Sequence, residues 1–151
     1  MQKFESVDQA LDWAIEREEE AARFYTDLAA KMEHAEVQQV FQEFAFEELG
    51  HKMRLLGIRQ GRLLMPEAKK VQNLKLADYL VDVPAQSDLT YKEALILAMK
   101  REKASFHLYS DLAATTENPT LRSTFLTLAS EEARHKLRFE LEYDREFLTE
   151  N

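Results

Sequence analysis

The stretch that decides the fold is Phe41-Gln-Glu-Phe-Ala-Phe-Glu-Glu-Leu-Gly-His51-Lys52, because it occurs twice in the chain. The second copy lies 84 residues later, without a gap, as Phe125-Leu-Thr-Leu-Ala-Ser-Glu-Glu-Ala-Arg-His135-Lys136. The segment before the first copy, Ala10 to Ala30, recurs with the same offset as Ala94 to Ala114. A repeat that continues over two segments indicates that one supersecondary unit is used twice.

All four repeated segments carry apolar residues in steps of three and four, the period of an amphipathic helix. The positions in this rhythm include Leu11, Ala14, Ala21, Leu28, Val37, Phe41, Phe44, Leu55, Leu95, Ala98, Leu112, Leu121, Phe125, Leu128 and Phe139. Boundary signals agree with the pattern: two capping boxes (Ser6-x-x-Gln9 and Thr90-x-x-Glu93), the pair Asn118-Pro119 at a helix start, and Gly61 at a helix end. We predict helices at about 7–32, 35–60, 89–116 and 119–148.

The connections favour an all-α four-helix bundle built from a duplicated helical hairpin. Within each half the loop is only a few residues long, so the two helices must be antiparallel neighbours. Residues 61–88 are long enough to return along the bundle as one crossover, in which Val71 to Leu80 forms a short helix or an apolar strap. We predict one domain over residues 1–151, with repeat halves at about 7–60 and 89–148.

Composition excludes several classes of function. Twenty-eight Asp and Glu against twenty Lys and Arg give a formal charge of −8, which repels nucleic acids and anionic lipids. The absence of Cys excludes disulfides, thiol catalysis, iron–sulfur clusters and thiolate-bound zinc, so any metal must be held by oxygen and nitrogen. The first residues lack the order of a signal peptide, and no apolar stretch is long enough to span a bilayer. We expect a cytoplasmic protein with no nucleic-acid or membrane partner.

Six ionisable residues stand where the helical pattern calls for apolar ones. They are Glu18, Glu48, His51, Glu102, Glu132 and His135. A Glu and a His three residues apart share one helix face, so both can reach the same metal site. Two such Glu-x-x-His helices, with one Glu from each of the other two, form the ligand set of di-iron and di-manganese carboxylate bundles. A lone core-facing Glu or His is more often a satisfied polar residue, but the repeat of all six in register favours a metal site.

Charge arithmetic favours two ions. Four ionised carboxylates and two neutral imidazoles total −4, which two divalent cations neutralise, whereas an empty site would suffer repulsion and desolvation. An oxygen-rich set with one imidazole per ion suits iron, or alternatively manganese, better than structural zinc.

Other candidates are weaker. Tyr25 and Tyr109 lie two turns after Glu18 and Glu102, so each is a candidate catalytic residue that hydrogen-bonds a ligand or acts as a redox neighbour, with core packing as the alternative. Four further polar residues are expected on solvated faces or in turns: His34, Glu47, His107 and Glu131.

The two stretches Ala14-Ile-x-x-Glu18-x-x-Ala-x-x-Phe-Tyr25 and Glu47-Glu48-x-x-His51, both repeated, resemble the ferritin-like di-iron superfamily and, within it, the rubrerythrin family. The resemblance implies a ferritin-like fold in which Glu48 and Glu132 bridge two iron ions. It also implies that Glu18 and Glu102 are terminal ligands and that His51 and His135 each bind one ion. In such proteins the reduced pair reacts with hydrogen peroxide or dioxygen in oxidative-stress defence, so we expect a di-iron oxidoreductase.

The chain departs from full-length rubrerythrins in two respects. It contains no four-cysteine rubredoxin site, so electrons must come from a separate donor protein or a small reductant. Rubrerythrins also carry an additional Glu where this chain has Ser105, with Ala21 at the equivalent place in the first half. Two alternatives therefore stay open: a ferroxidase that handles iron, and a non-catalytic metal-binding bundle. Apolar residues off the main seam, Trp13 and Leu97, predict a homodimer or higher oligomer.

Overall fold

The computed structural model describes residues 4, 6–61, 74–81 and 89–148, and every element within them is helical. Two long helices, α1 (Val7–Ala30) and α2 (Ala35–Gly61), are followed by a short 3-10 helix, η1 (Leu76–Tyr79). The chain continues with α4 (Tyr91–Ala114), α5 (Pro119–Tyr143) and a π-helical end, η2 (Asp144–Leu148). Among the described residues, none of the helices has both the length and the apolar character needed to cross a membrane.

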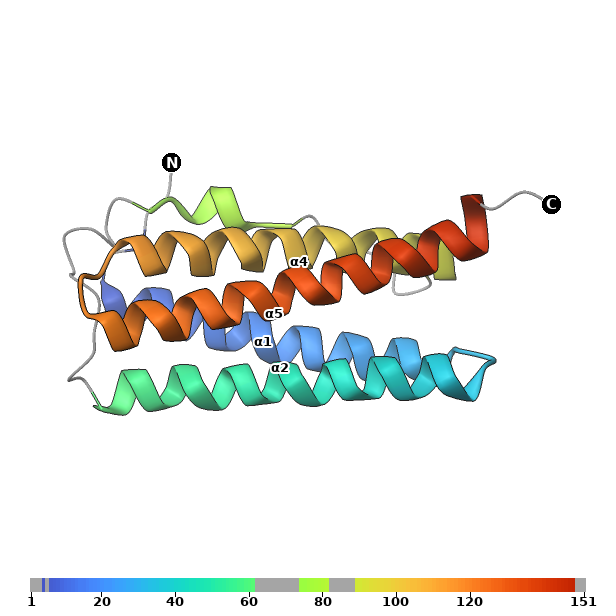
Figure 1. The fold of residues 1–151 in the computed structure, drawn as a ribbon, viewed down its shortest axis with the longest axis horizontal. Helices are drawn as coiled ribbons and strands as arrows, with labels where there is room; N and C mark the ends of the chain where they lie inside the picture. Colours follow the sequence, from blue (N-terminus) through green and yellow to red (C-terminus); the bar gives the residue numbers. More distant parts are fainter. Residues whose placement is uncertain (1–3, 5, 62–73, 82–88, 149–151) are drawn as a thin grey trace. The chain divides into compact units, whose positions relative to one another are not determined.

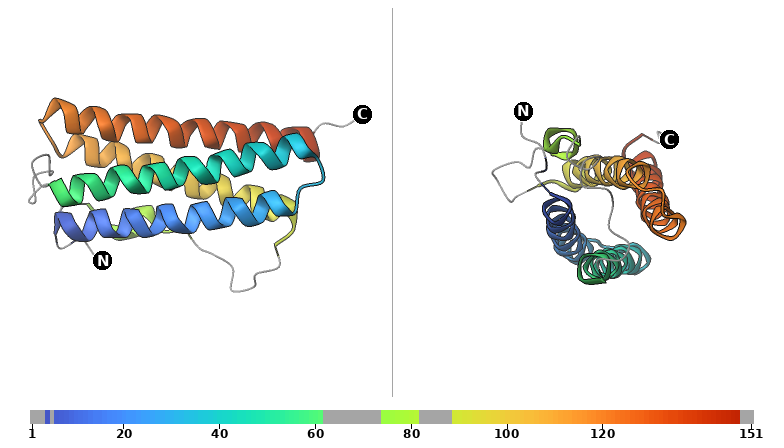
Figure 2. Two further views of the ribbon diagram at one scale, coloured as in Figure 1. Left: turned by 90° about the horizontal axis from the view of Figure 1, so that it is seen from below. Right: turned by 90° about the vertical axis from the view of Figure 1, so that its left-hand side faces the viewer.

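The chain divides into two compact units at the boundary between the repeat halves. One unit, Lys3–Leu74, contains α1 and α2, and the other, Met1–Gln2 with Lys75–Asn151, contains the remaining elements. In both units two long helices lie side by side and are joined by a short loop (Figures 1 and 2). Each unit is thus a helical hairpin, as the sequence predicts, while the single domain over residues 1–151 stays a prediction.

The α1–α2 hairpin buries the stripe that the periodicity selects. The side chain of Ser6 accepts a hydrogen bond from the Gln9 N–H and so begins α1. In the interior, the Phe44 ring lies 6.5 Å from the ring of Tyr25 and 6.3 Å from that of Phe41. On the outer side, Lys52 donates to Glu19 on α1, and Arg59 donates to Asp12 on the same helix. An apolar interior and two ion pairs therefore join the helices.

The α4–α5 hairpin begins each helix with a side-chain cap. Thr90 and Glu93 form the complete capping box of α4, and Asn118 accepts hydrogen bonds from two N–H groups at the start of α5, where Pro119 is the first helical residue. The short helix η1 lies beside α4 (Figure 1). The Tyr79 hydroxyl of η1 donates a hydrogen bond to Oδ2 of Asp111 on α4 at 2.7 Å. The apolar strap expected within residues 71–80 is therefore a 3-10 helix at Leu76–Tyr79, and residues 71–73 lie outside the described residues.

Helix limits agree with the sequence to within a few residues, with two differences. The last five residues expected in the fourth helix, 144–148, are π-helical. The prediction that Leu97 is an outward-facing apolar residue is wrong, because Leu97 is 5% exposed. The buried face of α4 is therefore wider than the i, i+3, i+4 stripe. The crossover expected over 61–88 lies mostly outside the described residues, except Gly61, the last residue of α2, and the segment around η1.

Candidate metal centre

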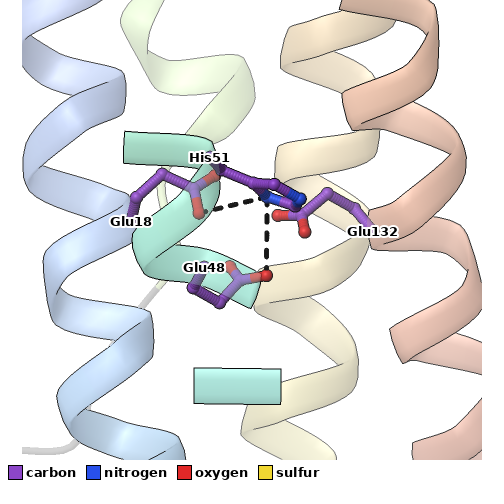
Figure 3. A group of neighbouring side chains, drawn as sticks. All are labelled: Glu18, Glu48, His51 and Glu132. Carbon is purple, nitrogen blue, oxygen red and sulfur yellow. Dashed lines mark ion pairs between the residues drawn. The ribbon is translucent and has the colours of Figure 1, made fainter. Parts of the chain in front are cut away.

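The first hairpin brings Glu18, Glu48 and His51 together, and we name this group the first triad. The Nδ1 atom of His51 lies 3.4 Å from Oε2 of Glu18 and 3.6 Å from Oε1 of Glu48, as the dashed lines in Figure 3 indicate. Glu18 comes from α1, and the other two residues come from adjacent turns of α2. Glu132, also labelled in Figure 3, belongs to α5 in the other unit.

The second hairpin repeats this arrangement with Glu102, Glu132 and His135, the second triad. The Nδ1 atom of His135 lies 3.6 Å from Oε1 of Glu102 on α4 and 3.7 Å from Oε1 of Glu132, its neighbour by one turn on α5. Three corresponding residues therefore form the same group in both repeats, with distances that agree closely. An internal repeat of a geometry, as well as of a sequence, indicates that the group itself is what the repeat preserves.

Each triad is enclosed. The three residues of the first are at most 2% exposed and those of the second at most 1%. Within each triad every residue offers one ligand atom, and these atoms lie within 4.8 Å of one another. Burial of carboxylates away from water is costly unless a positive charge compensates them. The energetic cost is a reason to expect a cation at such a group.

The donor set fits a divalent transition metal. Two ionised carboxylates and one neutral imidazole carry a formal charge of −2 in each triad, which one divalent cation neutralises. Carboxylate oxygen with imidazole nitrogen, and no sulfur, is a set that iron and manganese accept. The residues present in each hairpin therefore fit one such ion, and their roles as ligands stay a prediction.

The structure places the weaker candidates in two groups. Tyr25 and Tyr109 are buried, at 0% and 1% exposure, and Tyr25 packs edge-on against Phe44 on α2, so core packing accounts for part of its position. The expectation of solvated positions is met by His34 and His107, which are exposed, whereas Glu47 and Glu131 are half-buried. A catalytic role for either tyrosine stays a prediction.

Sequence reasoning missed one buried carboxylate, Glu142, which is 4% exposed. Its Oε1 accepts a hydrogen bond from the Tyr91 hydroxyl at 2.7 Å, and both of its oxygens accept from the Arg145 guanidinium. Burial, followed by the hydrogen bond to Glu142, raises the pKa of the Tyr91 hydroxyl. The offset of 84 residues could have revealed this site, since the counterpart of Glu142 is the apolar Ile58. The group joins α4 to the last turn of α5, and the corresponding residues of the first hairpin are Val7, Ile58 and Gly61, which have no polar side chain.

Solved structures share this fold. A Thermotoga maritima protein that has been assigned as a ferritin-like diiron-carboxylate protein is 27% identical, with a TM-score of 0.76, and the match covers 97% of this chain and 99% of that protein. A protein from Pyrococcus furiosus, described only as hypothetical, is 21% identical with a TM-score of 0.75, and the match covers 95% of each chain. These likenesses identify a ferritin-like four-helix fold. The comparison with curated proteins gives no match.

The sequence model of the rubrerythrin family matches residues 9–143, which include both triads and all four long helices almost in full. The match agrees with the resemblance carried by the repeated Glu-x-x-His pattern. The chain belongs to the rubrerythrin family.

Proposed function

We propose that this protein is a di-iron oxidoreductase that reduces hydrogen peroxide or dioxygen. The observation that carries the proposal is the repeated, buried group of two carboxylates and one imidazole, one on each hairpin. Membership of the rubrerythrin family and the assignment of the Thermotoga maritima protein as a diiron-carboxylate protein support it. In this proposal each triad holds one ion, and the two ions form one centre.

The proposed roles follow the chemistry of each side chain. Glu18 and Glu102 would each bind a single ion, as would His51 and His135 through a ring nitrogen. Glu48 and Glu132 would be shared between the two ions, as the resemblance to rubrerythrin implies. Two bound iron ions would supply the two electrons that convert hydrogen peroxide, with two protons, into two molecules of water. Manganese is the alternative metal, because the same ligands accept it.

The surrounding side chains would control access and protonation. Phe41, Phe125 and Phe139 are at most 1% exposed, so they would help to exclude bulk water from the interior of each hairpin. Tyr25 and Tyr109 lie seven residues after the terminal carboxylates on the same helices, a spacing of about two turns. Their hydroxyl groups are suited to donate a hydrogen bond to a ligand carboxylate and hold it in place. Such residues would act through a ligand and would be positioning residues.

Stopped-flow absorbance tests the oxidant. The protein is loaded anaerobically with Fe(II), its iron content is checked, and it is mixed with hydrogen peroxide or, separately, with dioxygen. We expect peroxide to oxidise the bound iron much faster than dioxygen does. A Glu132→Ala variant should lose this oxidation, and its retention would contradict the assignment.

A ferroxidase is the second candidate, favoured by the absence of a further ligand. Where rubrerythrins have an additional Glu, this chain has Ser105, which is half-buried on α4. A ferroxidase would oxidise Fe(II) with dioxygen and then release the product, so iron would leave the protein after each turnover. The same stopped-flow experiment, followed by desalting and iron analysis, separates the two activities. A non-catalytic bundle would show neither reaction.

The electron donor is a further part of the proposal. The printed sequence has no Cys, so no rubredoxin-type iron site is encoded in it. Re-reduction of the iron would therefore depend on a separate donor protein or on a small reductant, in the cytoplasm.

A further inference from the structure

The two triads have equivalent ligands but different surroundings. In each hairpin two carboxylates lie beside one imidazole, and the distances from the histidine Nδ1 atom to the carboxylate oxygens agree closely between the hairpins. If these three residues alone determined the affinity for a metal ion, the two triads would bind equally. The charged side chains next to the ligands differ, however, and most of the difference lies on the helices that contain Glu18 and Glu102.

The helix segments that contain the first triad carry nearly balanced charge. These segments, 15–21 and 45–54, include every residue within three positions of a ligand. Apart from the ligands they contain four acidic and three basic side chains, a net charge of −1. The seven are Glu16, Arg17, Glu19, Glu20, Glu47, Lys52 and Arg54.

The corresponding segments around the second triad, 99–105 and 129–138, are strongly basic. Apart from the ligands they contain six basic side chains and one acidic side chain, a net charge of +5, in a chain whose formal charge is −8. The seven are Lys100, Arg101, Lys103, Glu131, Arg134, Lys136 and Arg138. The difference arises at four positions of the repeat, where Glu16, Glu19, Glu20 and Gly50 correspond to Lys100, Lys103, Ala104 and Arg134.

One of these positions changes a contact beside the triad. In the first hairpin, Lys52 on α2 donates to Glu19 on α1. The counterparts in the second hairpin are Lys136 and Lys103, which carry like charges and cannot form this pair. Lys136 instead pairs with Glu140 on its own helix, at 2.9 Å. Even with Glu140 included, the net charge around the second triad is +4.

Charges this close to a metal site affect its affinity. A divalent cation is repelled by each positive side chain and attracted by each negative one. Salt screens such interactions over about 8 Å at physiological ionic strength, so side chains within one helical turn of a ligand, about 5.4 Å along the axis, are only partly screened. For a difference of six unit charges, screened Coulomb interactions correspond to a ratio on the order of tenfold in Kd.

We propose that the flanking charges make the first triad bind a divalent cation about ten times more tightly than the second triad. The proposal rests on the proposed function in one respect, that each triad binds a metal ion. Fe(II) would fill the first triad first, and the ion at the second triad would exchange more readily. In this account Lys100, Lys103 and Arg134 lower the affinity of the second triad without being ligands.

Two variants measure the triads separately. The first triad stays complete in His135→Ala, and the second stays complete in His51→Ala. Equilibrium dialysis against buffered Fe(II), without oxygen, gives a Kd for each variant. We expect the Kd of His51→Ala to be about ten times that of His135→Ala, with a ratio that falls as salt is added. The separate measurement is needed because repulsion between two bound ions produces two binding steps in the wild type even when the sites are equal.

Matched charge reversals in the otherwise wild-type chain test the cause. Lys100→Glu/Lys103→Glu should lower the larger of the two Kd values about fivefold. The reciprocal change at the corresponding positions of α1, Glu16→Lys/Glu19→Lys, should raise the smaller Kd by about the same factor. The loss of the ion pair between Glu19 and Lys52 has little effect on stability, because both side chains are partly exposed. Circular dichroism checks that each variant is folded.

The controls are Glu33→Lys and Glu117→Lys, which correspond to each other in the repeat and lie at exposed positions after α1 and α4. Each is fifteen residues from the nearest ligand on the preceding helix and should leave both Kd values unchanged. Equal Kd values for the two histidine variants, a tighter second triad, or charge reversals without effect would overturn the proposal. A wild-type protein that binds no Fe(II) would overturn the proposed function as well, whereas two equal sites would contradict only the inequality.

Discussion

The Nδ1 atom of His51 lies 3.4 Å from Oε2 of Glu18, a contact that joins α1 to α2 inside the first hairpin. Because the two residues are 33 positions apart, the pairing of the helices, and not local sequence, brings them together. Burial on well-packed helices holds both side chains near the same point. The hairpin therefore places a carboxylate and an imidazole where both could bind one metal ion. Glu102 and His135 form the corresponding pair in the second hairpin.

Replacement of the buried carboxylate of Glu48 should affect the stability of the metal-free protein and the stabilisation by bound metal differently. In Glu48→Gln we expect the midpoint of metal-free unfolding to stay the same or to rise, because one buried negative charge is removed from the first triad. Metal at a hundredfold excess over its Kd should stabilise the wild-type protein by about 2.7 kcal/mol for each ion bound, and the variant by much less. Thermal unfolding with and without Fe(II) measures both effects.

The control for this experiment is Glu43→Gln, an exposed position on the same helix. It should behave as the wild type does in both conditions. The role of Glu48 as a ligand is contradicted if Fe(II) stabilises Glu48→Gln as strongly as it stabilises the wild-type protein.

The capping box of α4 should make stability depend on acid pH. Hydrogen bonds from the backbone N–H and then the side chain of Thr90 hold the pKa of the Glu93 carboxyl below its ordinary value of 4.5. A carboxyl with a lowered pKa in the folded state stabilises the fold above the ordinary pKa, and this contribution is lost as the pH falls through the folded-state value. We expect Glu93→Gln to be less stable than the wild type at neutral pH, with a difference that disappears in acid.

Urea unfolding between about pH 3 and pH 7 measures this difference. Glu117→Gln, in the exposed loop before α5, is the control and should differ little from the wild type at any pH. If the difference in the free energy of unfolding between the wild type and Glu93→Gln grows as the pH falls, the Glu93 carboxylate does not stabilise the start of α4 as proposed.

The strap formed by η1 should depend on one hydrogen bond, from the Tyr79 hydroxyl to Asp111. Tyr79→Phe keeps the ring, which is buried, and removes the hydroxyl, so we expect a loss of about 1 kcal/mol in the free energy of unfolding. Asp111→Ala should cost a similar amount. The double variant should cost clearly less than the sum of the two, because both changes remove one interaction. Additive losses in this cycle would mean that the two side chains do not stabilise each other.

Gly50→Ala should stabilise the chain. A Cβ atom at this position meets nothing within 4 Å, so alanine should raise the free energy of unfolding by about 0.5–1 kcal/mol through its higher helix propensity. Urea unfolding of the variant and the wild type measures the difference. A loss of stability would show that the fold needs glycine at position 50.

Much of this fold could be predicted from the sequence, because its elements depend on local signals. The helical period located all four long helices, and Ser6, Thr90 and Asn118 begin helices as expected. The six candidate ligands could be found because the repeat places each of them on the buried face of its helix. Their grouping around His51 and His135 follows from the same register.

Features that depend on contacts between distant residues could not be predicted. Leu97 lies off the main stripe of α4, and the helical period of α4 does not show that this residue is buried. The repeat offset could have singled out Glu142, but no helical period pairs it with Tyr91, which lies 51 positions earlier and donates a hydrogen bond to it.

The central claim is that each hairpin holds one iron ion, and iron analysis after anaerobic loading tests it most directly. The wild-type protein should retain about two Fe per chain after desalting, as a di-iron carboxylate bundle requires. His51→Ala and His135→Ala should each retain about one or fewer, whereas His34→Ala, in an exposed turn, should retain both. A wild-type protein that retains no iron, or histidine variants that retain as much as the wild type, would contradict the account.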